Sequence, residues 1–292
     1  MSWLWLAVGV NGFAQAPGYR ERFRELMQQG KRQDAEAVVA RWTKARPRDP
    51  DLYVARFNLL MAGAEVIALR TTPAKEGELQ LTDQKSGQVA GSIGSGYNPV
   101  KVQQAMQVLR EGIALAPDRL DMRFGLAKAA ELNDDARQQL HIVAEALAWR
   151  QAAPGRTWRW RDGQALPSPE TEFVPVAVEE YMVPYWTSDT PAGYQQALAL
   201  AELLLRYYPA SSLGYFNKGN YYAFTHNDAE AYKWFAEADQ RNPDDPQLIN
   251  NLLRISLNLK KKAAAQGYLA RLRKYPDFAQ DCQRLAAELE KL

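Results

Sequence analysis

Small residues and prolines recur every 33 or 34 positions in the C-terminal half of this 292-residue chain. Ala231 and Pro243 are followed 33 residues later by Ala264 and Pro276, and Pro209 precedes Pro243 by 34 residues. A period of this length is typical of arrays of paired helices, in which each unit buries its apolar surface against its neighbours. The chain is therefore expected to fold as an all-α solenoid.

Apolar residues at helical spacing predict about six helix pairs, separated by prolines, glycines and Asp-Pro-Asp-type turns. The pairs are expected near 19–29 and 34–46, 51–69 and 98–116, 118–132 and 135–151, 171–187 and 191–208, 211–225 and 228–241, and 245–259 and 261–275. A last amphipathic helix over 277–291 would cover the exposed apolar face of the final pair, because a terminal repeat has no further neighbour.

The clearest repeats lie within 178–276 and show which residues meet between paired helices. Gly219 and Ala231 are placed where only small side chains permit two helices to cross closely. Aromatic residues stand at the adjoining positions: Tyr215, Tyr222 and Phe235. This spacing resembles the tetratricopeptide repeat, although Arg271 replaces a small residue in the last full repeat. The resemblance implies that the first helices of the pairs line a concave, partner-binding surface.

Two stretches break the period and are expected to be inserted β-hairpins. Over 71–97, two alternating runs flank a Lys-Ser-Gly turn, and the run GSIGSG at 91–96 is expected to be a flexible link. Over 154–169, Trp158 and Trp160 alternate with arginines before an Asp-Gly pair that favours a tight turn. Insertions in repeat arrays form loops on one face, where the individual function of a member is expected.

Polar residues on the first helices of the late repeats form the leading candidate site. Asparagine amides can donate to and accept from a peptide backbone, and arginine can bind a carboxylate. We therefore expect a groove near residues 181–254 that holds an extended peptide or a protein partner. The predicted partner-binding residues are Asn217, Asn220, Asn250, Asn251, Arg254, Tyr181 and Tyr185. The alternative for the asparagines is a solvated polar face, and for the tyrosines a place in the core between repeats.

The tryptophans of the second insertion suggest another function. Residues two apart on a strand face the same side, so Trp158 and Trp160 could form a flat platform for a sugar. The chain would then be a glycan-binding accessory protein of an outer-membrane uptake system. Alternatively, both rings pack on the adjacent helices, which would remove this site.

Signals for chemistry are weak, and we expect neither enzymatic activity nor a cofactor or metal. The chain has two histidines, His141 and His226, at a spacing that matches no zinc site, and one cysteine, Cys282. Neither a Gly-x-Ser-x-Gly motif nor a Gly-Lys-Ser/Thr phosphate loop occurs. A formal net charge of +2 gives no general attraction to nucleic acid. An enzyme with an unfamiliar site stays an alternative, and it would require several ionisable groups at one insertion.

The first 16 residues are predicted to be a secretory signal peptide. An apolar run, Trp3 to Val10, is followed by the small-residue exit Ala14-Gln15-Ala16, and the run is too short to span a bilayer. The mature chain, 17–292, would then be periplasmic or secreted and would meet the membrane only through the cleaved signal. No basic residue precedes the run, so a cytoplasmic protein with a buried N-terminal helix is the alternative.

Overall fold

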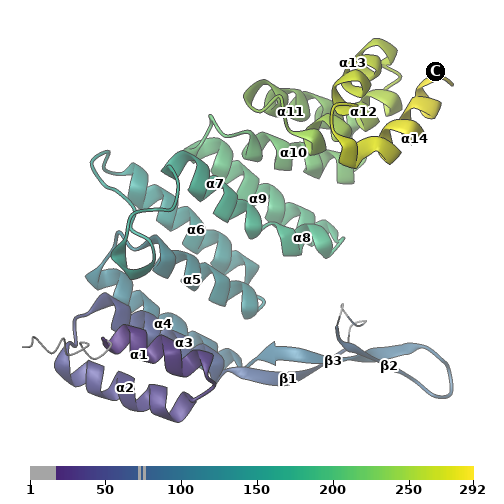
Figure 1. Ribbon diagram of the computed structural model, residues 1–292. Helices are drawn as coiled ribbons and strands as arrows, with labels where there is room; N and C mark the ends of the chain where they lie inside the picture. Colours follow the sequence, from purple (N-terminus) through teal and green to yellow (C-terminus); the bar gives the residue numbers. More distant parts are fainter. Residues whose placement is uncertain (1–17, 72–73, 75–76) are drawn as a thin grey trace, which may run out of the picture. The chain divides into compact units, whose positions relative to one another are not determined.

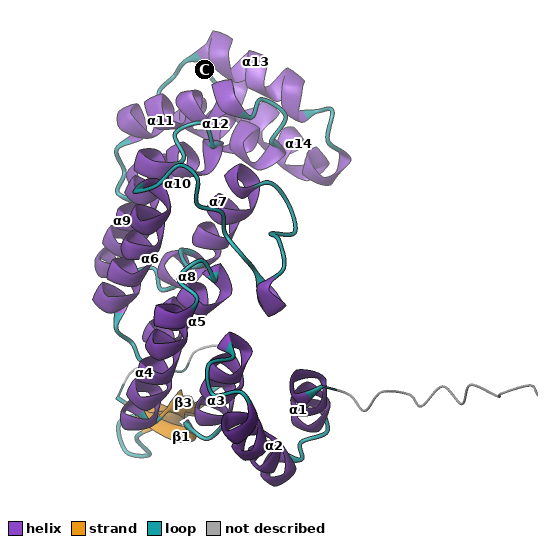
Figure 2. Cartoon of the chain, turned by 90° about the vertical axis from the view of Figure 1, so that its left-hand side faces the viewer, coloured by secondary structure: helices purple, strands orange, loops and turns teal. Residues whose placement is uncertain are grey.

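The computed structural model describes residues 18–71, 74 and 77–292 (Figures 1 and 2). The predicted signal peptide therefore lies outside the described residues. The chain divides into two compact units, one ending at Ala116 and the other spanning Pro117–Leu292. None of the described helices combines the length and the apolar character needed to cross a membrane.

The first unit contains two helix pairs. Its helices are α1 (Tyr19–Gln28), α2 (Arg32–Ala45), α3 (Pro50–Ala62) and α4 (Pro99–Leu115), and α1 packs on α2 while α3 packs on α4. Both pairs occur where the sequence predicts them. The core of α1, α2 and α3 is formed by fully or nearly fully buried apolar residues: Phe23, Leu26, Ala35, Val38, Val39, Trp42, Leu52, Ala55 and Leu59.

Between α3 and α4 the chain forms a three-stranded antiparallel sheet, here named the β-arm, which projects from the helices of the first unit (Figure 1). Its strands β1 (Glu65–Arg70), β2 (Leu79–Thr82) and β3 (Val89–Tyr97) are arranged in the order β1-β3-β2. The insertion is β-structured as predicted, but it is larger than a hairpin over 71–97. Its first strand starts at Glu65, inside the stretch predicted as helix 51–69.

The run GSIGSG is part of β3, which corrects the prediction of a flexible link. Close packing accounts for its glycines. A side chain on Gly91, which has φ +155°, would place Cβ 2.1 Å from the carbonyl oxygen of Arg70. The guanidinium of Arg70 pairs with Glu78 at 2.6 Å and also donates to the carbonyl of Ser95 at 2.7 Å, so it lies across β3. Glycines in a strand often mark such close approaches.

The second unit contains four helix pairs and a terminal helix. The pairs are α5 (Leu120–Leu132) with α6 (Ala136–Gln151), α7 (Glu170–Glu180) and α8 (Val183–Thr187) with α9 (Pro191–Tyr207), α10 (Ser212–Phe224) with α11 (Asp228–Arg241), and α12 (Pro246–Asn258) with α13 (Lys262–Leu272). The fold class predicted from the sequence is thus confirmed. The helix expected over 171–187 is interrupted between α7 and α8, next to Pro184, which lacks the N–H that a continuous helix would need.

The contact between α10 and α11 confirms the role expected of the small residues. Gly219 lies against the ring of Phe235, and a Cβ on Gly219 would be 2.4 Å from Cδ1 of that ring. Ala231 and Phe235 are both buried. The larger Arg271 is accommodated because it points to the neighbouring second helix, where it forms a bidentate ion pair with Asp239 at 2.6 and 2.8 Å.

The C-terminal helix α14 (Ala279–Leu289) caps the last pair, as predicted. Cys282, Leu285 and Leu289 are buried against α12 and α13, and Phe278 is partly buried beside them. The cap therefore covers apolar surface that the last repeat would otherwise expose to water.

The second insertion is not a β-hairpin, which corrects the prediction for 154–169. It contains one turn of 3₁₀ helix at Arg161–Gly163 and isolated bridges rather than paired strands. The backbone of Arg159 exchanges hydrogen bonds with the segment before α5, at 2.8 Å to the carbonyl of Asp118 and 2.9 Å from the amide of Leu120. Local pairing is limited to one antiparallel bridge, in which the N–H of Trp160 donates to the carbonyl of Gln164 at 2.7 Å across the expected Asp162-Gly163 turn.

Candidate partner-binding surface

The first helices of the four pairs in the second unit adjoin one another in sequence order. Each is joined to the next by a hydrogen bond, which gives a continuous first-helix surface composed of α5, α7, α10 and α12. The bonds run from Tyr181 Oη to the carbonyl of Phe124 at 2.8 Å, from Asn217 Nδ2 to Glu179 Oε1 at 2.7 Å, and from Asn251 Nδ2 to Asn220 Oδ1 at 3.4 Å.

Asn217 is a structural residue of this surface rather than an accessible one. Its side chain is buried and accepts a bond from Trp186 Nε1 at 3.0 Å. The amide nitrogen donates to Glu179 and to the carbonyl of Leu213 at 3.0 Å. With these three bonds the amide holds α7, α8 and α10 together, and it has no donor left for a partner.

Glu179 acquires an unusual protonation behaviour from the same packing. Burial raises the pKa of its carboxyl above the usual 4.5, the hydrogen bond from Asn217 opposes that rise, and the negative charge of Asp245 adds to it. Since the folded-state pKa lies above the unfolded-state pKa, the contribution of Glu179 to stability is complete below the unfolded-state pKa. It is lost as the pH rises through the folded-state pKa.

We therefore expect the substitution Glu179→Gln to remove part of the loss of stability with rising pH. The neutral amide can still accept the bond from Asn217 but carries no charge to desolvate. Urea unfolding of the wild type and the variant, compared from pH 4.5 upward, should give free energies of unfolding that diverge in favour of the variant as the pH rises. Glu180→Gln, at the adjacent exposed position, is the control and should follow the wild type. Parallel profiles for all three proteins would contradict this assignment.

The other predicted tyrosines also bond within the chain. Tyr181 is buried, and Tyr185 donates from its hydroxyl to Gln139 Oε1 at 2.6 Å. Burial is the main cause that raises the pKa of Tyr185 to about 12. Asn250 is buried as well. Tyr185, Asn220 and Asn251 are half-buried and Arg254 is exposed. Because the Tyr185 hydroxyl is bonded to Gln139, the two asparagines and Arg254 are the predicted residues whose polar groups a partner could reach.

A cleft of about 690 Å³ opens between α5 and α7 and is bounded by the second insertion. Its lining residues are Phe124, Lys128, Trp160, Arg161, Ser168, Glu172, Phe173, Val176, Ala177, Glu180 and Tyr181. The aromatic rings pack edge to face, with centroids 4.8 Å apart for Trp160 and Phe173 and 5.8 Å apart for Phe124 and Tyr181. Such contacts hold the rings in fixed positions, so the wall of the cleft is preformed.

One stripe of α7 lines the cleft with an apolar residue between two carboxylates. Val176, 51% exposed, lies between Glu172 and Glu180 at four-residue spacing, so the three share one helix face. Neither carboxylate forms an ion pair with a described residue. On the other side Arg161 stacks over Trp160, 5.7 Å from the ring centroid. The sequence carried a signal for this site, an apolar residue flanked at i−4 and i+4 by glutamates, but a solvated helix face has the same pattern.

Comparisons with known proteins give only distant likenesses. No family model and no curated protein matches the sequence. Among solved structures, pilF of Pseudomonas aeruginosa is 11% identical, covering 92% of this chain and 96% of that one at a TM-score of 0.42. PilW, a widely conserved type IV pilus biogenesis factor, is 14% identical with the same coverage and TM-score. YrrB, a TPR protein with an unusual peptide-binding site, is 11% identical, covering 87% and 98% at a TM-score of 0.42. Likeness at this level carries no information on what this chain binds.

The chain's own contacts decide the type of fold. Helix pairs recur with the period of the sequence, Gly219 admits Phe235 at the crossing of α10 and α11, and hydrogen bonds join successive first helices. The chain is a tetratricopeptide-like repeat protein. In this repeat protein the two departures from the plain period are the β-arm and the second insertion, and the second insertion forms one wall of the cleft.

The tryptophans of the second insertion do not form an exposed platform. Trp158 is buried, with its ring centroid 4.8 Å from that of Trp149. Trp160 is half-buried between Phe124 and Phe173. Both rings pack on the neighbouring helices. The proposed sugar platform thus loses the buried Trp158, whereas Trp160 still lines the cleft.

Groups that could support chemistry are scattered. Over 18–71, 74 and 77–292 the repeat protein has no cluster of three or more His, Cys, Asp and Glu side chains that could hold a metal. His141 is exposed near Glu145 at 3.4 Å, and His226 is an exposed turn residue with φ +58° after α10. Cys282 is buried in the cap.

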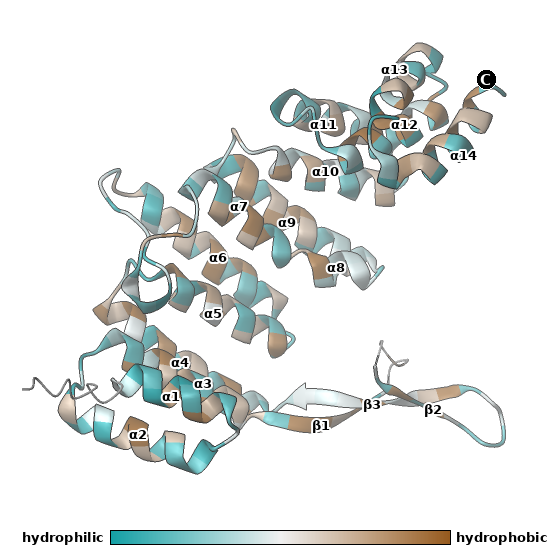
Figure 3. Cartoon of the chain, viewed as in Figure 1, coloured by the Kyte–Doolittle hydropathy of each residue, from teal (hydrophilic) through white to brown (hydrophobic). Residues whose placement is uncertain are grey.

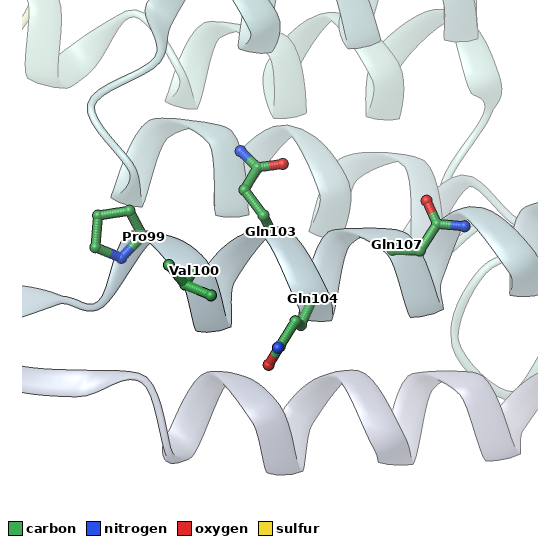
Figure 4. Close-up of a pocket in the computed structure, with 5 residues that line it drawn as sticks. All are labelled: Pro99, Val100, Gln103, Gln104 and Gln107. Carbon is green, nitrogen blue, oxygen red and sulfur yellow. The ribbon is translucent and has the colours of Figure 1, made fainter.

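A separate shallow pocket of about 490 Å³ lies on α4 in the first unit (Figure 4). Its lining residues are Pro99, Val100, Gln103, Gln104 and Gln107, all from one stretch of the helix. None of these side chains is ionisable, so the pocket offers amide and apolar contacts but no charge.

Proposed function

We propose that this chain is a non-catalytic scaffold that binds an extended peptide segment of a partner protein on the first-helix surface of its second unit. The observation that supports this function best is the preformed cleft between α5 and α7. Binding sites are typically concave, mostly apolar, and 300–1,000 Å³ in volume, with a few polar groups that fix orientation. The cleft is lined by aromatic rings, by the exposed Val176 and by the carboxylates of Glu172 and Glu180.

The accessible polar residues further along the same surface extend this site. Asn220 and Asn251 lie on neighbouring first helices, so their amides can bond a peptide backbone that crosses from α10 to α12. Arg254, one helical turn after Asn251, can bind a carboxylate of the same peptide. The groove proposed from the sequence near residues 181–254 is thereby reduced to three contacts and extended towards α5.

Export to the periplasm is proposed together with this function, on the strength of the apolar run and small-residue exit at residues 1–16. N-terminal sequencing of the protein purified from its own host tests it. A mature chain starting near residue 17 is expected, and a chain that retains Met1 or Ser2 would contradict export.

A tiled peptide array, followed by titration of the strongest binder, tests the polar part of the surface. We expect the double variant Asn220→Ala/Arg254→Ala to weaken binding by about tenfold or more, because a hydrogen bond to a charged group contributes about 1.5–3 kcal/mol. The control is Asn242→Ala/Arg273→Ala, which removes the same side chains at exposed positions immediately after α11 and α13. Unchanged binding by the first variant would remove these residues from the site.

A further inference from the structure

The β-arm exposes more apolar surface than a solvated sheet needs. Ile67 is 84% exposed, Leu69 73% and Leu79 71%. Figure 3 shows the corresponding hydrophobic stretches on β1 and β2. Contiguous apolar surface of this kind is unusual on an isolated protein and generally marks an interaction site.

The strand register collects these side chains on one face. Leu69 of β1 and Leu79 of β2 both stand opposite Ile93 of the central strand, so the three form a row across the sheet. Ile67 and Leu81 lie two residues away on their strands and therefore share the same side. These five residues are named the apolar face. The side chains of Val66, Arg70 and Gln80 point to the opposite face.

Charge on the sheet is confined almost entirely to the opposite face. The ion pair between Arg70 and Glu78 lies there. Glu65, at the base of β1 next to the helices, is the one charged strand residue on the same side as Ile67. An uncharged surface cannot recognise an anionic lipid or a nucleic acid, which bind through cations. The end of the arm carries Asp83 and Lys85, so entry into a bilayer by its tip would bring charge into lipid.

We propose that the apolar face is where two copies of this chain associate, sheet on sheet. Residues that lie on a two-fold axis meet their own copies, so a self-complementary surface must lack charge around the axis. The row of Leu69, Ile93 and Leu79 meets that requirement. An antiparallel arrangement centred on Ile93 sends Glu65 and its own copy to opposite ends of the interface, because Glu65 lies four residues from Leu69 of the central row. The two like charges therefore do not meet.

The size of the face sets the strength of the association. Three strands about 4.8 Å apart and about six residues long give a footprint of about 300 Å² per copy. The two copies together cover about 600 Å², less than the roughly 1,000 Å² of a specific permanent interface. The dimer is therefore reversible and depends on concentration, with a dissociation constant in the micromolar range or weaker.

Sedimentation velocity of the full chain from about 1 µM to about 500 µM, a range suited to such dissociation constants, tests the proposal. The wild type should shift from monomer to dimer over this range. Ile67→Ser should raise the dissociation constant at least tenfold, whereas Val66→Ser, the neighbouring residue on the opposite face and 43% exposed, should leave it within about twofold. Far-ultraviolet circular dichroism should be the same for all three. A wild type that stays monomeric, or equal weakening by both variants, would overturn the proposal.

Cross-linking supplies a second measurement. Sheets packed face to face lie about 10 Å apart, too far for a direct disulfide, so a bifunctional maleimide of about that length is used. It should convert Leu69→Cys into a covalent dimer, because Leu69 lies in the row at the axis, and should not cross-link Val66→Cys; the native Cys282 is buried and does not compete. Absence of the Leu69→Cys cross-link would overturn the proposed packing.

Vesicles of neutral phosphatidylcholine test the other possible occupant of the apolar face, a lipid surface. If the wild type floats with the vesicles, Ile67→Ser does not, and no dimer forms in solution, the apolar face binds lipid instead.

Discussion

Replacement of Phe235 by alanine is expected to lower the free energy of unfolding by about 3–5 kcal/mol, the usual cost of removing a buried aromatic ring. The ring is completely surrounded: Gly219 of α10 lies on one side, and the ring of Phe216 lies 5.9 Å away. Chemical denaturation measures the loss. Trp234→Ala, at the adjacent half-buried position, is the control and should cost clearly less.

Coupling between Phe235 and Gly219 tests the helix crossing itself. Gly219→Val alone should destabilise the chain by about 1–3 kcal/mol, since the new side chain would overlap the phenyl ring. In the Phe235→Ala background the same valine can enter the cavity, so its cost should shrink or change sign. The effect of valine on helix propensity is common to both backgrounds and cancels in the double-mutant cycle. Additive free energies would show that the two residues do not meet.

The sequence predicts the helix pairs well because the repeat itself dictates their packing. Period, proline positions and small residues such as Gly219 and Ala231 follow from how two helices must cross, and that crossing recurs in each unit. Even the terminal cap follows from an unburied apolar face. The interruption between α7 and α8 is a local departure at Pro184.

The insertions are harder to predict because their partners are distant in sequence. The apolar stretch at 65–70 continues the pattern of α3, and periodicity alone cannot separate a short apolar run in a strand from the end of a helix. The form of 154–169 depends on backbone pairing with Asp118 and Leu120 and on the packing of Trp158 against Trp149. No local pattern encodes either contact.

The candidate binding surface, like the fold, could be predicted from the sequence only in part. Asn217 and Asn220 are equivalent in the sequence, both polar and three residues apart on α10. Only the structure shows that Trp186 and Glu179 engage the first while the second remains reachable. A predicted stripe of asparagines thus divides into one structural residue and one candidate contact. The cleft itself, built from α5, α7 and the second insertion, needs the tertiary fold to exist.

The second substitution with a large expected effect is at Val176 in the cleft, and it acts on partner binding. We expect Val176→Lys to weaken binding of the array-selected peptide by at least tenfold, because burial of an apolar side chain of this size contributes about 1.5–3 kcal/mol. The variant should fold normally: Val176 is half exposed, and a lysine there lies four residues from both Glu172 and Glu180, a favourable spacing on a helix. Val183→Lys is the matched control, since Val183 is 56% exposed on α8 outside the cleft.

The titration of that peptide into the wild type, Val176→Lys and Val183→Lys tests the central claim most directly. A partner-binding cleft between α5 and α7 predicts tight binding by the wild type and the α8 variant and a loss of at least tenfold for Val176→Lys. Equal affinity for all three proteins would contradict it.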